Sequence, residues 1–327
     1  MLIQKPSRGL LLATAVTALL SNLFTSAALA DDSIKQHHLT AEKSQYHESY
    51  EIDDVTLAFQ PVTWLLGYGF SVNPNWTLGY QGYRTQGEVE DLLPLPPENG
   101  VPFGRLTGEH EFTSHSIYAT RGFGNRWLGV SFALGQESRA VEFRSPNKAY
   151  RLSDETTYKT LSLNAGQSFF YDAWVLTAQT YFDYQTTLNQ YDFHFADGPR
   201  ENRLVSDLLV DQDSAGYIGS LSFSAGYDLF VWDLTLHPSI TWSHTRTLYG
   251  DINAFQQSGQ RQINPEQVTQ FSESDQSTMN SEANPSSVWR LATSVYWSSA
   301  WLNVSRQHVA GGAFGDDVFS LGVGVSL

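Results

Sequence analysis

The amino-acid sequence predicts an all-β protein that spans a membrane as an antiparallel up-and-down barrel. Three observations lead to this fold class. Several segments alternate strictly between apolar and small polar residues, which is the period of a strand with two different faces. Only 16% of the 327 residues are charged, whereas a soluble surface usually carries about 25% or more. After residue 30 the chain contains no apolar run of the roughly 18 residues that a membrane-spanning helix requires.

The alternation separates large apolar residues from small ones. In residues 128–134 the large side chains of Leu128, Val130, Phe132 and Leu134 share one face, and Gly, Ser and Ala residues form the other. Residues 217–229, 232–242 and 318–327 repeat this pattern. A soluble barrel places charged residues on its polar face, because that face meets bulk water. Small polar residues instead suit a narrow lumen with the apolar face turned toward lipid.

The spacing of the turns predicts the number of strands. Hairpins with tight turns are expected near residues 62–86, 111–138, 157–188, 214–246 and 288–309, followed by a last strand from residue 317. Because a closed antiparallel sheet needs an even number of strands, we expect one more strand around residues 46–58. The sequence therefore predicts twelve strands, with ten as the alternative. Longer polar links are expected at about residues 86–109, 143–156, 190–213, 248–287 and 310–316.

The first 30 residues have the layout of a signal peptide. Lys5 and Arg8 precede an apolar run that ends in small residues, which predicts cleavage between Ala30 and Asp31. Residues 31–45 are then a polar periplasmic lead or a possible plug of the lumen, and residues 46–327 form the barrel. His37, His38 and His47 lie in or beside this polar segment, but they lack the further ligands that a metal site requires.

Five of the nine tryptophans lie beside the tight turns. Tryptophan favours the membrane interface, where its ring is half buried and its N–H stays hydrated. We therefore expect a periplasmic aromatic girdle, and its members are Trp76, Trp127, Trp174, Trp232 and Trp301.

Several polar residues fall on the face of their strands that is predicted to line the lumen. They are Gln179, Tyr181, Asp183, Asp228 and Arg290. Such residues select ions in an open pore, or they pair with one another in a filled lumen. The sequence favours the filled lumen and leaves the narrow channel for small solutes as the alternative.

Composition and charge exclude several classes of function. The chain has no cysteine, which excludes disulfides and thiol chemistry, and its net charge of −15 argues against nucleic acid as a partner. No cofactor is indicated. His244 and His194 are the candidates for a hydrolase site at the barrel rim, but polar residues at a wet rim explain them better. We expect the partners to be outer-membrane lipid, lipopolysaccharide and the barrel-assembly machinery, with an unidentified ligand possible at the surface.

Residues 213–251 carry a resemblance to a known family. Ser220 to Asp228 have the form Ser-Leu-Ser-x-x-x-Gly-Tyr-Asp, and after a tight turn Leu234 to Pro238 have the form Leu-Thr-Leu-x-Pro. This run resembles the translocator barrel of autotransporters, and looser similarity covers about residues 62–250. The family carries a secreted passenger before the barrel, whereas only about 20 residues separate Asp31 from the first expected strand.

The resemblance implies a solitary translocator-type barrel in the bacterial outer membrane. We expect a structural or surface-interaction role without enzymatic activity. The narrow channel is the first alternative, and a hydrolase at the rim is the second.

Overall fold

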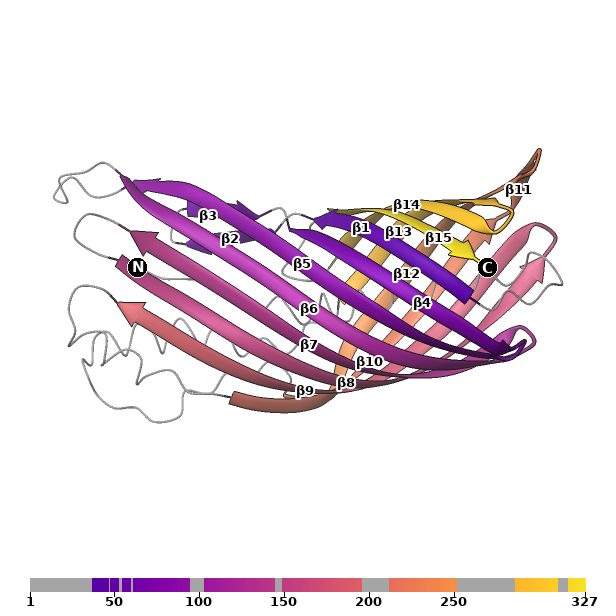
Figure 1. Cartoon of the computed structure of the whole chain (residues 1–327), viewed down its shortest axis with the longest axis horizontal. Helices are drawn as coiled ribbons and strands as arrows, with labels where there is room; N and C mark the ends of the chain where they lie inside the picture. Colours follow the sequence, from indigo (N-terminus) through magenta and orange to yellow (C-terminus); the bar gives the residue numbers. More distant parts are fainter. Residues whose placement is uncertain are drawn as a thin grey trace.

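The computed structural model describes residues 37–46, 48–52, 55–59, 61–94, 103–144, 149–195, 212–251, 286–310 and 317–327. These residues form strands and the tight turns between them (Figure 1). The barrel strands are β1 (His37–Tyr46), β4 (Val62–Asn73), β5 (Trp76–Pro94), β6 (Phe103–Phe123), β7 (Arg126–Arg144), β8 (Ala149–Tyr171), β9 (Trp174–Phe195), β10 (Gln212–Tyr227), β12 (Leu234–Asp251), β13 (Ser286–Trp297), β14 (Ala300–Ala310) and β15 (Asp317–Ser326). The short strand β11 (Leu229–Val231) continues β10 beyond Asp228.

The sheet closes into a barrel because its first and last strands pair. Each strand is antiparallel to its neighbours, and β1 pairs with both β4 and β15. Two backbone hydrogen bonds between His37 and Leu327, of 3.0 and 2.8 Å, complete the β1–β15 ladder. With β10 and β11 counted as one strand, the closed barrel has the twelve strands that the sequence predicts.

The position of the first strand is a correction to the sequence prediction. The expected strand at residues 46–58 is not a barrel strand, because β2 (Glu48–Ile52) and β3 (Val55–Phe59) pair only with each other as a separate two-stranded sheet. Residues 37–45 were expected to be a polar lead or plug, and they belong instead to barrel strand β1. The outward face of β1 explains the error, because apolar Leu39 and Ala41 are followed there by Lys43 and Gln45. Because two of these four outward residues are polar, the sequence of β1 lacks the apolar alternation by which a barrel strand is predicted.

The five tight turns lie at one end of the barrel, which we call the tight-turn end, and the opposite end is the loop end. The turns are residues 74–75, 124–125, 172–173, 232–233 and 298–299, and they lie toward the right in Figure 1, at the end where the chain terminates. The strands extend farther toward the loop end than predicted, since residues 86–94, 103–109 and 149–156 are strand rather than link. Beyond a membrane both faces of a strand are wet, so the alternation that marks a strand is lost there.

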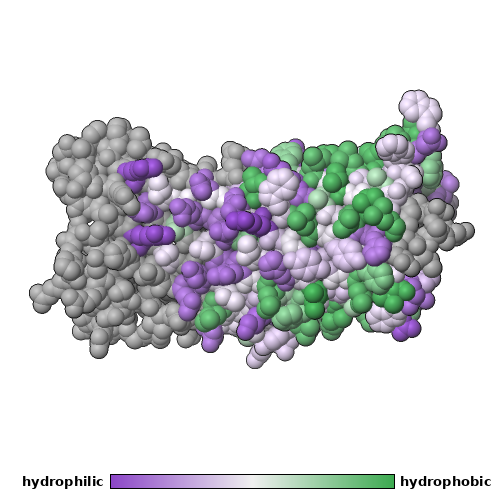
Figure 2. All heavy atoms as spheres, viewed as in Figure 1, coloured by the Kyte–Doolittle hydropathy of each residue, from purple (hydrophilic) through white to green (hydrophobic). Residues whose placement is uncertain are grey.

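An apolar band surrounds the outer wall at the tight-turn half of the barrel. We call it the apolar belt, and Figure 2 shows it as the green side chains over the right half of the molecule. Its exposed members include Leu66, Leu78, Ile117, Leu128, Val130, Phe132, Leu163, Phe182, Phe223, Ile240, Leu302, Val304 and Leu321. These large apolar side chains are exposed on the outside of the barrel, whereas in a soluble protein such side chains form the core. In the part of the chain that is described, no helix is long and apolar enough to cross a membrane.

Candidate functional site in the barrel lumen

The inward face of β9 is polar and almost fully buried. Gln179, Tyr181, Asp183 and Gln185 are each no more than 4% exposed. Between them, Phe182 and Tyr184 point outward and are about ten times more exposed. The period of two that separates the faces of a strand therefore separates a polar interior from an apolar exterior.

Inward side chains from different sides of the barrel lie within electrostatic range of one another. Tyr83 on β5 lies within electrostatic reach of Glu42 on β1 and Tyr181 on β9. The Glu42 carboxylate also acts on Arg290 of β13. In the order of strands around the barrel, β1 and β9 lie half a turn apart. At this level the inward side chains of these four strands are therefore close enough to influence one another electrostatically.

Arg290 is held by a chain of hydrogen bonds on its own wall. Its Nη2 donates to Oδ1 of Asn303 at 3.1 Å, and Nδ2 of Asn303 donates to Oγ of Ser294 at 2.8 Å. Arg290, Asn303 and Ser294 are all buried. The guanidinium is therefore held against its own wall by a charge-assisted hydrogen bond to Asn303.

A second polar cluster lies nearer the loop end and was missed by the sequence analysis. Nε2 of His110 lies 2.9 Å from Oε1 of Glu137, and the Tyr158 hydroxyl donates to Oε2 of the same carboxylate. Glu137 is 0% exposed, and both partners are buried with it. The three residues come from β6, β7 and β8, which are consecutive in the barrel. Only the pairing register brings them together, and no local motif in the sequence marks them.

Asp228, the remaining residue predicted to line the lumen, lies at the tight-turn end. Its Oδ1 is 2.7 Å from Nδ1 of His237 on β12. The imidazole of His237 lies over Gly226, where a Cβ atom would stand 2.2 Å from Nε2. Glycine is required at that position to admit the ring, and the Asp228–His237 pair then lies where β10 is interrupted.

The five predicted girdle tryptophans divide between the two faces of the wall. Trp76 and Trp174 are exposed on the lipid-facing side, and Trp232 is 95% exposed in its turn with a φ of 55°. Trp127 and Trp301 correct the prediction, because each is one residue from an outward leucine and has the opposite parity. Their rings lie inside the barrel over Gly166 and Gly324 of the neighbouring strand. Closeness to a turn therefore does not decide on which face a tryptophan lies.

Of the two histidines considered for a hydrolase, His244 is described, and its hydrogen bond joins it to a serine rather than to a carboxylate. Nδ1 of His244 lies 3.0 Å from Oγ of Ser287, and its ring stacks on Trp242. His194 lies in β9, but its side chain is outside the described part of the structure. Among the residues that the structure describes, no group of three or more His, Asp or Glu side chains is placed to hold a metal ion. Ala30, Asp31 and His47 also lie outside the described residues.

No protein-family model and no curated protein matches this chain. Among solved structures, the translocator domain of the autotransporter NalP from Neisseria meningitidis matches with a TM-score of 0.60 and 12% identity, over 96% of this chain and 98% of that one. The β-domain of the Bordetella autotransporter BrkA matches with a TM-score of 0.49 and 13% identity, over 89% and 100%. The toluene transporter TodX of P. putida matches with a TM-score of 0.49 and 10% identity, over 93% and 92%.

The similarity to the NalP domain establishes the fold. The chain has the twelve-stranded barrel fold of autotransporter translocators, as the resemblance in residues 213–251 predicts. At such low identity the likeness carries no residue roles.

Proposed function

We propose that this chain is a non-enzymatic outer-membrane barrel whose lumen is closed by its own side chains and which has a structural or surface-interaction role. The observation that carries the proposal is the burial of the inward polar residues. A water-filled pore leaves such side chains wet, whereas Tyr181 and Asp183 are among the least exposed residues of the chain.

The strand number alone does not decide whether a barrel conducts. Barrels of about 8 strands are filled by side chains and barrels of 16–18 leave a channel, so a barrel of twelve depends on what its inward residues are. Here they include Tyr83, Tyr181, Arg290 and Glu42, all of which are buried. Bulky buried side chains within electrostatic range of one another support a closed barrel rather than a solute channel.

The distribution of polar and apolar surface supports an orientation in the outer membrane. Barrels of this membrane have short turns on the periplasmic side and longer loops outside. The apolar belt of this chain begins at the tight-turn end, and the strands continue as polar ribbons beyond the belt toward the loop end. The loop end is then the surface available to an external ligand.

Planar bilayer recordings on the purified full-length protein test the closed lumen. We expect no steady conductance, because ions have no continuous wet path. The double substitution Tyr83→Ala and Tyr181→Ala removes two buried rings from the lumen and is expected to produce conducting steps. Phe182→Ala is the matched control, since Phe182 adjoins Tyr181 but points outward.

Two results would contradict this proposal. Steady ion-selective steps from the unaltered protein would establish the narrow channel instead. Hydrolysis of ester or peptide substrates by the purified protein, lost on His244→Ala, would establish the rim hydrolase.

A further inference from the structure

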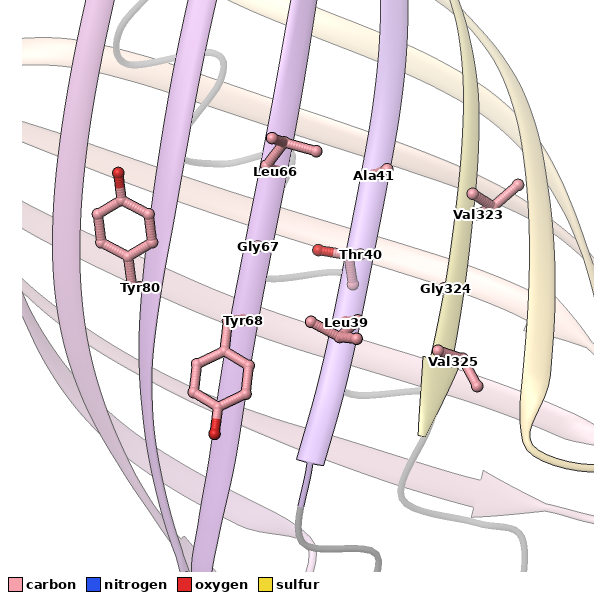
Figure 3. Close-up of a pocket in the computed structure, with 10 residues that line it drawn as sticks. All are labelled: Leu39, Thr40, Ala41, Leu66, Gly67, Tyr68, Tyr80, Val323, Gly324 and Val325. Carbon is pink, nitrogen blue, oxygen red and sulfur yellow. The ribbon is translucent and has the colours of Figure 1, made fainter. Parts of the chain in front are cut away.

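The outer wall carries an apolar hollow where the two ends of the barrel sheet meet. It has a volume of about 550 Å³ and extends over β15, β1, β4 and β5 (Figure 3). Its lining includes Leu39, Ala41, Leu66, Tyr80, Val323 and Val325. Except for the small Ala41, these are large side chains on the lipid-facing wall.

The hollow exists because one small residue stands between larger ones. Ala41 is opposite Leu66 on β4 and Val323 on β15 in the two ladders. Both neighbours are exposed members of the apolar wall, and the methyl group of Ala41 does not fill the space between them. The resulting depression is open to the membrane side, so its natural occupant is a hydrocarbon chain.

Basic side chains border this hollow on the side of the loop end. Lys43 follows Ala41 by two residues on the same face of β1, and its Nζ lies 5.4 Å from the centroid of the Trp64 ring. Trp64 is opposite Arg84 of β5 in the next ladder. On the other side, the guanidinium of Arg306 on β14 lies 5.6 Å from the Phe319 ring.

Lys43, Arg84 and Arg306, which we call the basic strip, therefore stand at the edge of the apolar belt on the alternate strands β1, β5 and β14. All three are exposed. Glu111 accepts a hydrogen bond from Nη2 of Arg84 at 3.0 Å, which leaves the other guanidinium donors available. In a chain with a net charge of −15, three cations bordering one hollow form a local exception.

We propose that this wall binds a phosphorylated and acylated lipid of the outer leaflet, namely lipopolysaccharide. An acyl chain lies in the hollow over Ala41, and the lipid phosphates are bound by the basic strip. The loop end faces the outer leaflet in the orientation proposed above, and this inference rests on that orientation. Arg and Lys bind phosphate through charge-assisted hydrogen bonds, which are about twice as strong as neutral ones.

The same wall provides a matched control for simple charge attraction. Lys159 on β8 also points outward directly beyond the apolar belt, and its neighbours there are Leu161 on its own strand and Leu134 on β7. Lys159 therefore matches Lys43 in charge and in its place at the edge of the apolar belt. The outward residue two positions away within the belt is Leu161, where β1 has Ala41. Replacing Lys159 removes an equal charge at a site that has large apolar side chains in place of Ala41.

The experiment measures binding of purified lipopolysaccharide to the full-length barrel in mixed micelles. Binding of dephosphorylated lipopolysaccharide and of phosphatidylglycerol is measured in parallel. The triple variant Lys43→Gln, Arg84→Gln, Arg306→Gln is expected to weaken lipopolysaccharide binding about tenfold or more, since loss of charge-assisted contacts accounts for at least that factor. Ala41→Leu fills the hollow without changing the charge and is expected to weaken it several-fold. Lys159→Gln is expected to leave it unchanged.

Several outcomes would overturn the proposal. Equal weakening by Lys159→Gln would mean attraction to charge anywhere on the wall, and no effect of Ala41→Leu would mean that the hollow is unused. Equal binding of the dephosphorylated lipid would mean that the lipopolysaccharide phosphates are not recognised, and equal binding of phosphatidylglycerol would mean that the wall does not distinguish lipopolysaccharide from other anionic lipids. Heat-modifiable mobility on gels shows that each variant is folded. Conductance from the unaltered barrel would contradict the closed lumen but would leave the binding result standing, so the two proposals fail separately.

Discussion

The inner and outer faces of one strand obey different rules in this barrel. Tyr181 of β9 is 4% exposed and lies in the lumen, whereas Phe182, the next residue, is 44% exposed on the outer wall. The inner residue is surrounded by polar groups from other strands, and Tyr83 lies within electrostatic range of Tyr181. The outer residue needs only to be apolar, because lipid makes no directional contacts with it.

This difference means that polar contacts determine the interior while transfer into lipid determines the exterior. In a soluble protein the arrangement is reversed, since apolar residues form the core and polar residues form most of the surface. Substitutions on the two faces should therefore destabilise the barrel for different physical reasons.

Removing the carboxylate of Glu137 is expected to give the largest loss of stability. Glu137→Ala leaves buried His110 and Tyr158 without their shared acceptor, and loss of one partner of a buried pair costs roughly 3–5 kcal/mol. The free energy of unfolding in urea, measured for the barrel in lipid micelles, gives the value. Glu155→Ala removes an exposed carboxylate from β8 and is the control. Equal loss in both variants would show that burial of Glu137 is not what matters.

A charge on the outer wall should cost somewhat less. Leu163 lies within the apolar belt and is exposed, and Arg at such a depth costs about 2–4 kcal/mol. We expect Leu163→Arg to reduce the free energy of unfolding by that amount and to slow insertion into vesicles. Gln86→Arg introduces the same group on the outer face beyond the belt. If the two variants behave alike, the belt does not mark the membrane.

The contact between Trp127 and Gly166 tests the inward position of a predicted girdle residue. A Cβ atom on Gly166 would stand 2.0 Å from Cζ2 of Trp127, so Gly166→Ala displaces the ring and costs about 1–3 kcal/mol by overpacking. Trp127 fluorescence should shift as well, provided the other tryptophans are unchanged. At Gly122 the nearest atom to an added Cβ is 3.9 Å away. Gly122→Ala is therefore expected to be nearly neutral, and a large loss there would discredit the argument from crowding.

The exposed ion pair between Arg84 and Glu111 should contribute least. Both side chains are exposed, and solvent-exposed pairs contribute roughly 0.2–1 kcal/mol. Glu111→Gln should therefore change the free energy of unfolding by less than about 1 kcal/mol. The small difference should shrink further in high salt, because exposed charges are screened. A loss as large as that of Glu137→Ala would remove the distinction between the two faces.

The sequence predicts those parts of the fold that lipid determines. Leu128, Val130 and Phe132 alternate with small residues in the sequence and lie exposed on one face of β7 in the structure. The hairpins and the twelve strands follow from this alternation and from the tight turns. Where a strand leaves the belt, as β5 does after Gln86, the regular alternation of apolar and small residues stops and the prediction ends too early.

The polar interior is less accessible to prediction because it depends on pairing across strands. His110, Glu137 and Tyr158 are separated in the sequence, and only the register of β6, β7 and β8 makes them neighbours. Strand β1 was misplaced for a related reason, since Lys43 and Gln45 interrupt its apolar face. Lys43, one of these two residues, is also a member of the basic strip.

The pairing of β1 with β15 has a consequence for how the chain folds. This ladder joins His38 to Ser326, nearly the full length of the described chain, while the other barrel ladders join strands that follow one another closely. Hairpins can form as local units, but the cylinder cannot seal before its final strand is available. Until then two unpaired edges remain open to other chains. The slow step of folding should therefore be the meeting of β1 with β15, and delaying that encounter should favour aggregation over assembly.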